Sequence, residues 1–184
     1  GGVVRAFVEQ SDGKIIVAGS FGRVDGVACA GVVRLTTDGA VDGTFAAPSE
    51  IGSNVDALAL QPDGKVLVGG GFSSATLGNR LTRLNSDGSD DSSFAIGSGA
   101  DSWVEAIVCQ PDGKIVVAGS FTTFAGTAVG RIVRIESSGA IDSTFAPGSG
   151  FDSTVYGLAI LPEGRIGVGG YFNKINGTYQ YGFA

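Results

Sequence analysis

Internal repetition is the feature that most constrains what this chain can fold into. Four segments that align without a gap begin 51, 49 and 51 residues apart, at Val4, Val55, Val104 and Val155. They read VRAFVEQSDGKIIVAGSF, VDALALQPDGKVLVGGGF, VEAIVCQPDGKIVVAGSF and VYGLAILPEGRIGVGGYF. A fixed period of this length is the signature of repeat architectures, in which each repeat buries its apolar surface against its neighbours.

A second half-unit follows each of the first three segments, and it reads VVRLTTDGAVDGTF, LTRLNSDGSDDSSF or IVRIESSGAIDSTF. The chain therefore divides into repeats at 3–54, 55–103 and 104–154, with a partial fourth repeat at 155–184 that stops before its expected arginine. We expect these repeats to form one propeller-type domain, and the chain to be a segment of a longer array.

Each full repeat is predicted to contain four short strands joined by tight turns. Asp-Gly pairs such as Asp63-Gly64 separate two apolar runs, which is the strongest short-range signal for a two-residue hairpin turn. The first two strands are apolar on both faces, as in 57–60 and 66–68, and such strands are buried on both sides. The third strand mixes in charged residues, and the fourth is short. Doubly buried inner strands with half-exposed outer strands describe the blade of a β-propeller.

Composition agrees with this assignment. Glycine accounts for 32 of 184 residues, and it costs about 1 kcal/mol at an interior helical position. The predicted fold class is therefore all-β: a propeller-type array of four-stranded antiparallel blades, with three full repeats plus about half of a fourth. The two cysteines, Cys29 and Cys109, fall at non-equivalent places in the repeat, so we expect free thiols rather than a disulfide scaffold.

Charge and missing residue types argue against catalysis. The sequence contains no histidine, which removes histidine bases, histidine-dependent triads and most catalytic zinc sites. Each Gly-Lys pair is followed by Ile or Val, so no phosphate-binding loop is present. The net charge of −6 disfavours nucleic acid, and no apolar run reaches the ~18 residues of a membrane helix. We expect a non-enzyme without catalytic residues, cofactor, metal, nucleic-acid partner or membrane insertion.

The pattern QPDGK-apolar-GG-x-F, followed by R-L-x-x-DG-x-x-D-x-x-F, resembles the delta-60 repeat, a bacterial β-propeller repeat of unknown function. The resemblance spans essentially the whole chain, with Leu161, Glu163 and Arg165 replacing Gln, Asp and Lys in the fourth copy. It implies a large bacterial surface or secreted protein that carries tandem arrays. It supplies no catalytic residue.

Residues present in every full repeat are expected to serve the blade, whereas residues found in one repeat are free to serve a ligand. An arginine and an aspartate eight residues later are predicted to form a structural ion pair in each blade: Arg34 with Asp42, Arg83 with Asp91, and Arg134 with Asp142. The basic residues beside the first turn are interpreted as solvated charges: Lys14, Lys65, Lys114 and Arg165. Oxygen-bearing side chains alternate at Asp87, Ser89 and Asp91 as calcium ligands can, but too few of them recur to make a cage.

Residues specific to one repeat gather in the connection after the Gly-x-Phe strand and in the linker between repeats. Because both hairpin turns lie at one end of a blade, these segments open at the opposite end, which we call the variable face. It is the candidate binding face, and its candidate residues are Arg23, Asp25, Trp103, Phe124, Lys174 and Asn176. Asn176 also begins a glycosylation sequon, although a single three-residue match is close to chance.

Three aromatic residues are predicted to alternate on one strand face near the end of the sequence: Tyr179, Tyr181 and Phe183. Other repeats have small or aliphatic residues at these positions. Two interpretations remain open, namely packing in the core or between blades, and stacking on a sugar or a partner chain. Unpaired backbone groups along this strand would make it an assembly edge.

These observations favour a structural repeat module of a bacterial surface, secreted or fibre-like assembly, located outside the cell or on its surface. The expected partners are further repeats of the same chain or neighbouring subunits. The alternative is a propeller that binds a glycan or a surface protein, as an adhesin or lectin does.

Overall fold

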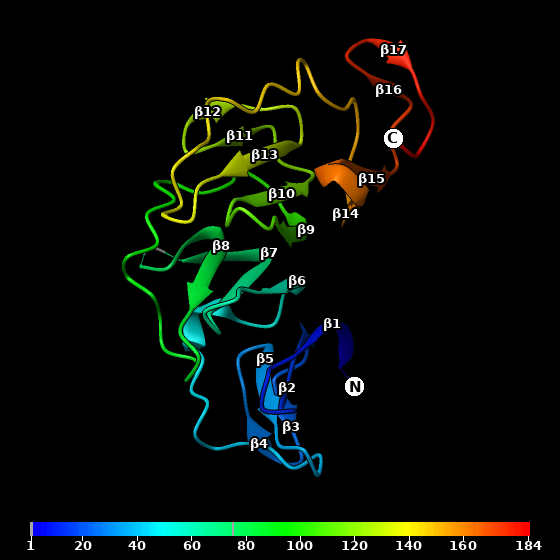
Figure 1. Cartoon of the computed structure of the whole chain (residues 1–184). Helices are drawn as coiled ribbons and strands as arrows, with labels where there is room; N and C mark the ends of the chain where they lie inside the picture. The colour runs from blue at the N-terminus through cyan, green and yellow to red at the C-terminus, as the bar shows by residue number, and fades with distance from the viewer. Residues whose placement is uncertain (1, 75) are drawn as a thin grey trace. The chain divides into compact units, whose positions relative to one another are not determined.

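The computed structural model describes residues 2–74 and 76–184. The chain divides into two compact units, Gly1–Ser92 and Ser93–Ala184, and each is built from antiparallel sheets (Figure 1). The helical segments of the described residues are two short 3-10 turns, η1 (Ser49–Ile51) and η2 (Pro162–Gly164). The all-β, propeller-type prediction is confirmed.

The first unit contains two blades. Blade 1 pairs, in this order, β1 (Val3–Glu9), β2 (Ile15–Ser20) and β5 (Val32–Leu35). Blade 2 pairs, in this order, β6 (Val55–Leu60), β7 (Val66–Ser74) and β8 (Gly78–Leu84). The expected fourth strand is reduced to one bridged residue, because Val41 pairs with Leu35 and Asp90 pairs with Leu84.

The second unit repeats this plan. Blade 3 pairs, in this order, β9 (Val104–Cys109), β10 (Ile115–Gly119) and β13 (Ile132–Ile135), and Ile141 bridges to Ile135. Blade 4 pairs β14 (Val155–Ile160) with β15 (Ile166–Gly170), and Phe183 bridges to Gly169 at the place of a third strand.

Each connection after the Gly-x-Phe segment folds into a small hairpin, which the sequence analysis did not predict. The strands are β3 (Arg23–Val24) with β4 (Val27–Ala28), β11 (Thr123–Phe124) with β12 (Thr127–Ala128), and β16 (Lys174–Ile175) with β17 (Thr178–Tyr179). In blade 2 the same connection prolongs β7 and β8, where Ser73 pairs with Asn79. Positive φ at two consecutive turn residues, such as Asn176 and Gly177, is the geometry of a type I′ hairpin.

A β-bulge in the first strand of each blade explains a recurring glycine. In blade 1 the register of β1 against β2 shifts between Val4 and Ala6, and equivalent shifts occur in the other blades. A Cβ atom at Gly19 would fall inside contact distance of the Val3 carbonyl oxygen. The same obstacle is present at Gly70, Gly119 and Gly170. The bulge and its glycine are therefore one feature of the repeat, because no larger residue allows this close approach.

The core of the first unit lies between its two sheets. The side of blade 1 that packs on blade 2 carries Ile16, Ala18 and Val32, and we call this side of a blade its forward face. The side of blade 2 that packs on blade 1 carries Val55, Val66, Val68 and Leu84, and we call this side the rear face. Burial of one such side chain stabilises the fold by about 1.5–3 kcal/mol, so stacking of faces is a main source of stability.

The second unit stacks its sheets in the same way. The forward face of blade 3 carries Val116, Ala118 and Ile132. The rear face of blade 4 carries Val155 and Val168, and both groups belong to one buried cluster.

The rear face of blade 1 is exposed. Val4 is 58% and Phe7 is 71% exposed, whereas Val55 and Val155, at the position of Val4 in blades 2 and 4, are fully buried. A shallow groove of about 340 Å³ is lined there by apolar residues that include Val17 and Val33. The residue pattern of a rear face is therefore present on blade 1 without a covering sheet.

Candidate functional site

A charged cluster recurs at the turn end of each full blade, and blade 1 shows its parts. The backbone N–H of Asp42 donates to the carbonyl oxygen of Arg34 at 2.9 Å, which fixes Asp42 beside β5. Oδ2 of Asp42 accepts from Nε of Arg34 at 2.9 Å and lies 3.0 Å from Nζ of Lys14. Oδ1 of Asp42 accepts from the hydroxyl and backbone N–H of Thr44 at 2.6 and 3.0 Å. Both oxygens of this buried carboxylate are therefore engaged.

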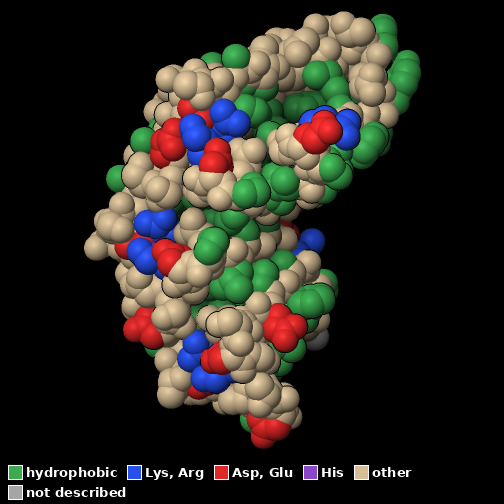
Figure 2. Space-filling view, in the orientation of Figure 1, with side chains coloured by type: hydrophobic (Ala, Val, Ile, Leu, Met, Phe, Trp, Pro, Cys, Tyr) green, Lys and Arg blue, Asp and Glu red, His purple; other side chains and the backbone are tan. Residues whose placement is uncertain are grey.

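The other full blades contain the same cluster. In blade 2, Oδ2 of Asp91 lies 2.7 Å from Nε of Arg83 and 2.8 Å from Nζ of Lys65. In blade 3 the same two distances, 2.7 and 2.8 Å, join Asp142 to Arg134 and Lys114. Figure 2 shows basic and acidic side chains in small mixed groups among uncharged surface. The structure thus contains each of the three Arg–Asp pairs at the place that the repeat assigns to it.

The lysines beside the first turn are not solvated charges, so that interpretation of the sequence was wrong. Ile16 pairs with Arg34 across β2 and β5, and Lys14 precedes Ile16 by two residues. Alternation therefore puts the Lys14 and Arg34 side chains on the same face of the sheet. Because the two hairpin turns share one end of the blade, the ammonium group reaches Asp42.

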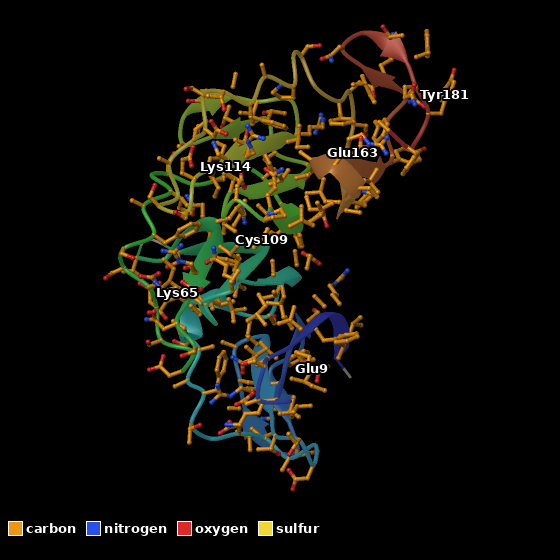
Figure 3. All side chains as sticks on the ribbon, in the orientation of Figure 1. Glu9, Lys65, Cys109, Lys114, Glu163 and Tyr181 are labelled. Atoms are coloured by element: carbon orange, nitrogen blue, oxygen red, sulfur yellow. The ribbon has the colours of Figure 1, made fainter. Side chains whose placement is uncertain are left out.

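Lys65 and Lys114 occupy the same position in blades 2 and 3 (Figure 3). Arg165, their counterpart in blade 4, donates from Nε to the carbonyl oxygen of Pro162 at 3.5 Å. The first-turn cation is thus part of the ion cluster in each full blade and has a different contact in blade 4.

An aromatic ring covers the arginine of the cluster. The guanidinium of Arg34 lies 5.0 Å from the ring centre of Phe45, and that of Arg134 lies 4.9 Å from the ring centre of Phe145. Cation–π contacts of this kind are worth about 0.5–2 kcal/mol and exclude water from the ion pair. The recurring phenylalanine of the second half-unit is therefore explained.

These contacts shift the titration of the cluster away from neutral pH. The hydroxyl and N–H of Thr44 hold the pKa of Asp42 well below its ordinary value. In blade 3 the Lys114 ammonium is the largest influence that lowers the pKa of Asp142, and the pKa of Lys114 is raised in return. A general acid or base needs a pKa near the working pH. The cluster is therefore built as a set of permanent ion pairs.

The cluster of blade 1 also reaches blade 2. Nη1 of Arg34 donates to the carbonyl oxygen of Ser86 in the outer turn of blade 2 at 2.7 Å. The backbone N–H of Ala46 donates to the carbonyl oxygen of Asp87 in the same turn at 3.0 Å. The second unit has the same type of backbone bond, from Ala95 to Ser138 at 2.8 Å. A groove of about 750 Å³ lies at the joint of blades 1 and 2, and its lining includes Gln10, Asp12, Arg34, Gln61, Asp63 and Asp87.

The alternating oxygens at 87–91 close a turn. Oδ1 of Asp87 accepts from the N–H and the hydroxyl of Ser89 at 2.9 and 2.6 Å. Across residues 2–74 and 76–184, no three Cys, Asp or Glu side chains are grouped as a metal site requires. Cys29 and Cys109 are half-buried and form no disulfide, and burial raises the pKa of Cys29.

Two candidate residues of the variable face, Arg23 and Asn176, form hydrogen bonds that stabilise the small hairpins. Nη1 of Arg23 donates to the carbonyl oxygen of Gly26 at 2.9 Å, across the turn that contains the exposed Asp25. Oδ1 of Asn176 accepts from the N–H of Gly150 at 2.9 Å. These contacts fix the hairpins, so Arg23 and Asn176 are positioned as structural residues at the face where a ligand was expected.

Phe124 is not available to a ligand, and its assignment to the binding face is corrected. Its side chain is fully buried, and its ring centre lies 6.2 Å from that of Phe121. The β11–β12 hairpin turns this side chain inward, and Phe124 also bridges to Ala100. Trp103 is 38% exposed and stays accessible.

Two aspartates of the inter-blade linkers were missed by the sequence analysis. Oδ1 of Asp101 accepts from the N–H groups of Thr122 and Thr123 at 2.7 and 3.0 Å. Oδ1 of Asp152 accepts from those of Asn173 and Lys174 at 2.8 and 3.0 Å. The backbone donors lower the pKa of Asp152. The signal that could have found these residues is the shared 51-residue offset of the two Asp-Ser pairs, 101–102 and 152–153.

The three aromatic residues near the end of the sequence do not alternate on one strand, which corrects the assembly-edge prediction. Tyr179 ends β17, Tyr181 follows it, and Phe183 pairs with Gly169 of blade 4. Tyr179 and Tyr181 form a stacked pair with ring centres 5.9 Å apart. Nζ of Lys174 lies 4.7 Å from the ring centre of Tyr179. All three aromatic residues are exposed, by 65%, 72% and 65% in sequence order.

A second ion pair, also missed, joins β1 and β6 in the first unit. Nε of Arg5 lies 3.1 Å from Oδ1 of Asp56, whose side chain is 6% exposed. Oδ2 of Asp56 has no hydrogen-bond partner among the described residues. Burial raises the pKa of Asp56, although the Arg5 guanidinium opposes the shift. The pair occurs once and lies in the bulge, so neither repetition nor alternation indicates it.

The blades and their recurring cluster define a propeller-type repeat protein. A family model described as a domain of unknown function (DUF5122) beta-propeller matches residues 10–45, 61–94 and 110–145, which is more than half of the chain. The chain belongs to this family. Each matched segment runs from the first turn of a blade to the recurring phenylalanine, so it contains the whole charged cluster. No curated protein matches the chain.

Solved structures share the fold at low sequence identity. The extracellular domain of a hybrid two-component system from B. thetaiotaomicron has a TM-score of 0.57 at 13% identity, over 91% of this chain and 20% of that one. A virginiamycin B lyase from Staphylococcus aureus has a TM-score of 0.53 at 16% identity, over 92% of this chain and 50% of that one. A protein of unknown function from Bacteroides caccae has a TM-score of 0.52 at 18% identity, over 92% of this chain and 53% of that one. The chain thus spans a fifth to about half of these proteins, and the likeness shows the fold alone.

Proposed function

We propose that this chain is a non-enzymatic structural repeat module of a bacterial surface, secreted or fibre-like assembly. The observation that carries the proposal is the use of the recurring polar residues. Lysine, arginine, aspartate and threonine of the cluster bond to one another within a blade, and Arg34 reaches the outer turn of the next blade. In blade 1, an arginine that recurs in every full blade thereby also serves the joint to the next blade.

The apolar rear face of blade 1 supports a role in assembly. Phe7 and Val4 project from it, and large exposed apolar patches usually mark interaction sites. The occupant that such a face fits is the forward face of another blade, because blades 2 and 4 bury their rear faces in that way. The partners of this chain are accordingly further repeats of the same chain or a neighbouring subunit.

An extracellular or cell-surface location fits the same proposal. One solved relative of similar fold is the extracellular domain of a two-component system. Among the described residues, no helix has the length and apolar character that a membrane span requires. The virginiamycin B lyase shares the fold at 16% identity, and fold alone does not carry an activity.

Sedimentation equilibrium across a concentration series tests the proposal. The wild type is expected to gain mass with concentration, and Phe7→Asp is expected to weaken this association at least tenfold. Val27→Asp is the matched control, since Val27 is 48% exposed on β4 outside the rear face. A wild-type chain that stays monomeric at every concentration, or equal weakening by both variants, counts against assembly through this face.

A further inference from the structure

Tyrosine is confined to one part of the second unit. The four tyrosines of the chain are Tyr156, Tyr171, Tyr179 and Tyr181. They are 58%, 77%, 65% and 72% exposed, in that order. Tyrosine combines an apolar ring with a polar hydroxyl, so an exposed group of this residue is suited to ligands that are themselves part apolar and part hydroxylated.

Two of these rings, those of Tyr179 and Tyr181, are preorganised by contact with each other. The ring centres of Tyr179 and Tyr181 are 5.9 Å apart with an interplanar angle of 30°, and Nζ of Lys174 lies 4.7 Å from the centre of Tyr179. We call these three residues the tyrosine column. Figure 3 shows Tyr181 at the outer side of the segment that follows the β16–β17 hairpin. A ring held by a neighbouring ring loses little rotamer freedom when a ligand binds.

The blade does not need the tyrosine column for its own packing. Ala28 and Ala128 occupy the position of Tyr179 in blades 1 and 3, and Ala30 occupies the position of Tyr181 in blade 1. Those blades form their hairpins with alanine. The tyrosines are therefore additions to the repeat, and their exposure shows that they stabilise little of the fold.

The segment at residues 180–182 is poorly suited to pair with a strand from another protein. The N–H of Gln180 donates to the carbonyl oxygen of Asn173 at 2.9 Å, and the N–H of Gly182 donates to that of Phe172 at 3.0 Å. The carbonyl oxygen of Gly182 accepts from the N–H of Gly170 at 3.0 Å. The backbone groups of Gln180 and Gly182 are thus paired with their own blade, and we assign recognition at this segment to the side chains.

The size of the tyrosine column fits a small ring better than a protein surface. A fully covered tyrosine buries about 150–250 Å², so two rings that are about 70% exposed offer roughly 300 Å². A standard protein–protein interface needs about 800 Å² on each partner. One or two saccharide rings match the smaller area.

We propose that the tyrosine column is a stacking platform for a neutral saccharide, with one pyranose ring lying against the exposed face of Tyr181. The C–H groups of a pyranose face pack on an aromatic ring, and the hydroxyl groups of Tyr179 and Tyr181 supply polar partners for the hydroxyl groups of the saccharide. The Gln180 side chain is not counted among them, because its Nε2 donates to the carbonyl oxygen of Phe183 at 2.9 Å. An acidic saccharide is disfavoured, because the chain has a net charge of −6 and the Lys174 ammonium is already engaged with Tyr179. This site is independent of the structural role proposed above.

Titration with neutral hexasaccharides tests the platform. Cellohexaose, xylohexaose and mannohexaose are added to the whole chain, and binding is followed by saturation-transfer NMR and isothermal calorimetry. At least one probe is expected to bind saturably. Tyr181→Ala should weaken that binding fivefold or more, and Tyr181→Phe should keep most of it because the ring remains. Tyr171→Ala is the matched control, since Tyr171 is equally exposed and lies outside the column.

Four results would overturn the platform. The first is no saturable binding of any neutral probe by the wild-type chain. The second is equal loss of binding in Tyr171→Ala and Tyr181→Ala. The third is binding of hexagalacturonate alone, which would identify an acidic glycan as the occupant. The fourth is self-association of the chain that Tyr181→Ala abolishes, which would identify a second copy as the occupant.

Discussion

At the scale of single residues, the first turn of a blade combines two different constraints. Gly64 has a φ of +83°, a conformation that L-residues rarely adopt. A Cβ atom added at Gly64 would lie 3.7 Å from Cβ of Ser86, which is an ordinary contact distance. The constraint at Gly64 is thus the backbone rather than space. Lys65 beside it is constrained by its bond to Asp91.

Substitution of the turn glycine should cost more than substitution of the lysine. Gly64→Val forces a β-branched residue into positive φ and should cost more than about 1 kcal/mol. Lys65→Ala removes one partner of a charge-assisted bond and should cost about 0.5–1 kcal/mol, above a typical surface change. Urea denaturation measures both.

Gly43→Val is the control for the glycine, because Gly43 lies in a turn without positive φ and with open space around it. It should be nearly neutral. A Gly43→Val chain as unstable as Gly64→Val would show that backbone conformation is not the cause.

Asp56 should make stability depend on pH in a definite direction. Its pKa is higher in the fold than the ordinary value of about 4, because its carboxylate is buried. Ionisation of Asp56 therefore opposes folding above the folded pKa, and this effect is absent below the unfolded pKa. The free energy of unfolding of Asp56→Asn, minus that of the wild type, should therefore be more positive at pH 7 than at pH 3.5. Urea unfolding midpoints at the two pH values measure this difference. A difference that is constant with pH, or larger at pH 3.5, would contradict the assignment.

At the scale of the strand and hairpin, the recurring ion cluster shows what sequence can and cannot reveal. The Arg83–Asp91 pair follows from a fixed spacing of eight residues around a turn. The addition of Lys65 depends on which sheet face each side chain occupies, and that follows from the strand register. Spacing is visible in a sequence, whereas register is a property of paired strands.

A double-mutant cycle should show that Arg83 and Asp91 are coupled. The pair is buried, with the two side chains 7% and 8% exposed. Asp91→Ala leaves a cation buried and should cost about 3–5 kcal/mol. Together with Arg83→Ala the coupling energy should be about 0.5–3 kcal/mol, measured by chemical denaturation. Strict additivity of the two substitutions would contradict a direct pair.

Repetition also explains which features of the variable face escaped prediction. The small hairpins have two-residue strands, too short for an alternating pattern to mark which side chain points inward. Phe124 was therefore assigned to the surface, although β11 buries it. Tyr179, Tyr181 and Phe183 were expected on one strand because neither the end of β17 nor the bend at Gly182 has a distinctive sequence signal. Ala28 and Ala30 occupy the same positions in blade 1, and this comparison could have predicted that the rings of Tyr179 and Tyr181 are exposed.

At the scale of the whole molecule, blades are joined by two kinds of contact. Apolar forward and rear faces supply most of the stability, and they are non-directional. Hydrogen bonds from one blade to the outer turn of the next supply direction, as Arg34 and Ala46 do toward Ser86 and Asp87. We infer that the recurring cluster serves this joint rather than a ligand.

Amide hydrogen exchange on two variants of the whole chain measures how far the cluster holds blade 1 to blade 2. Arg34→Ala removes the donor to Ser86 of blade 2, whereas Lys14→Ala removes another partner of the Asp42 carboxylate and leaves the bond from Arg34 to Ser86 in place. We expect Arg34→Ala to speed exchange at the Ala46 and Gly88 amides tenfold or more, and Lys14→Ala to leave both amides within twofold of the wild type. Unchanged protection of Ala46 and Gly88 in Arg34→Ala would show that the cluster does not hold one blade to the next.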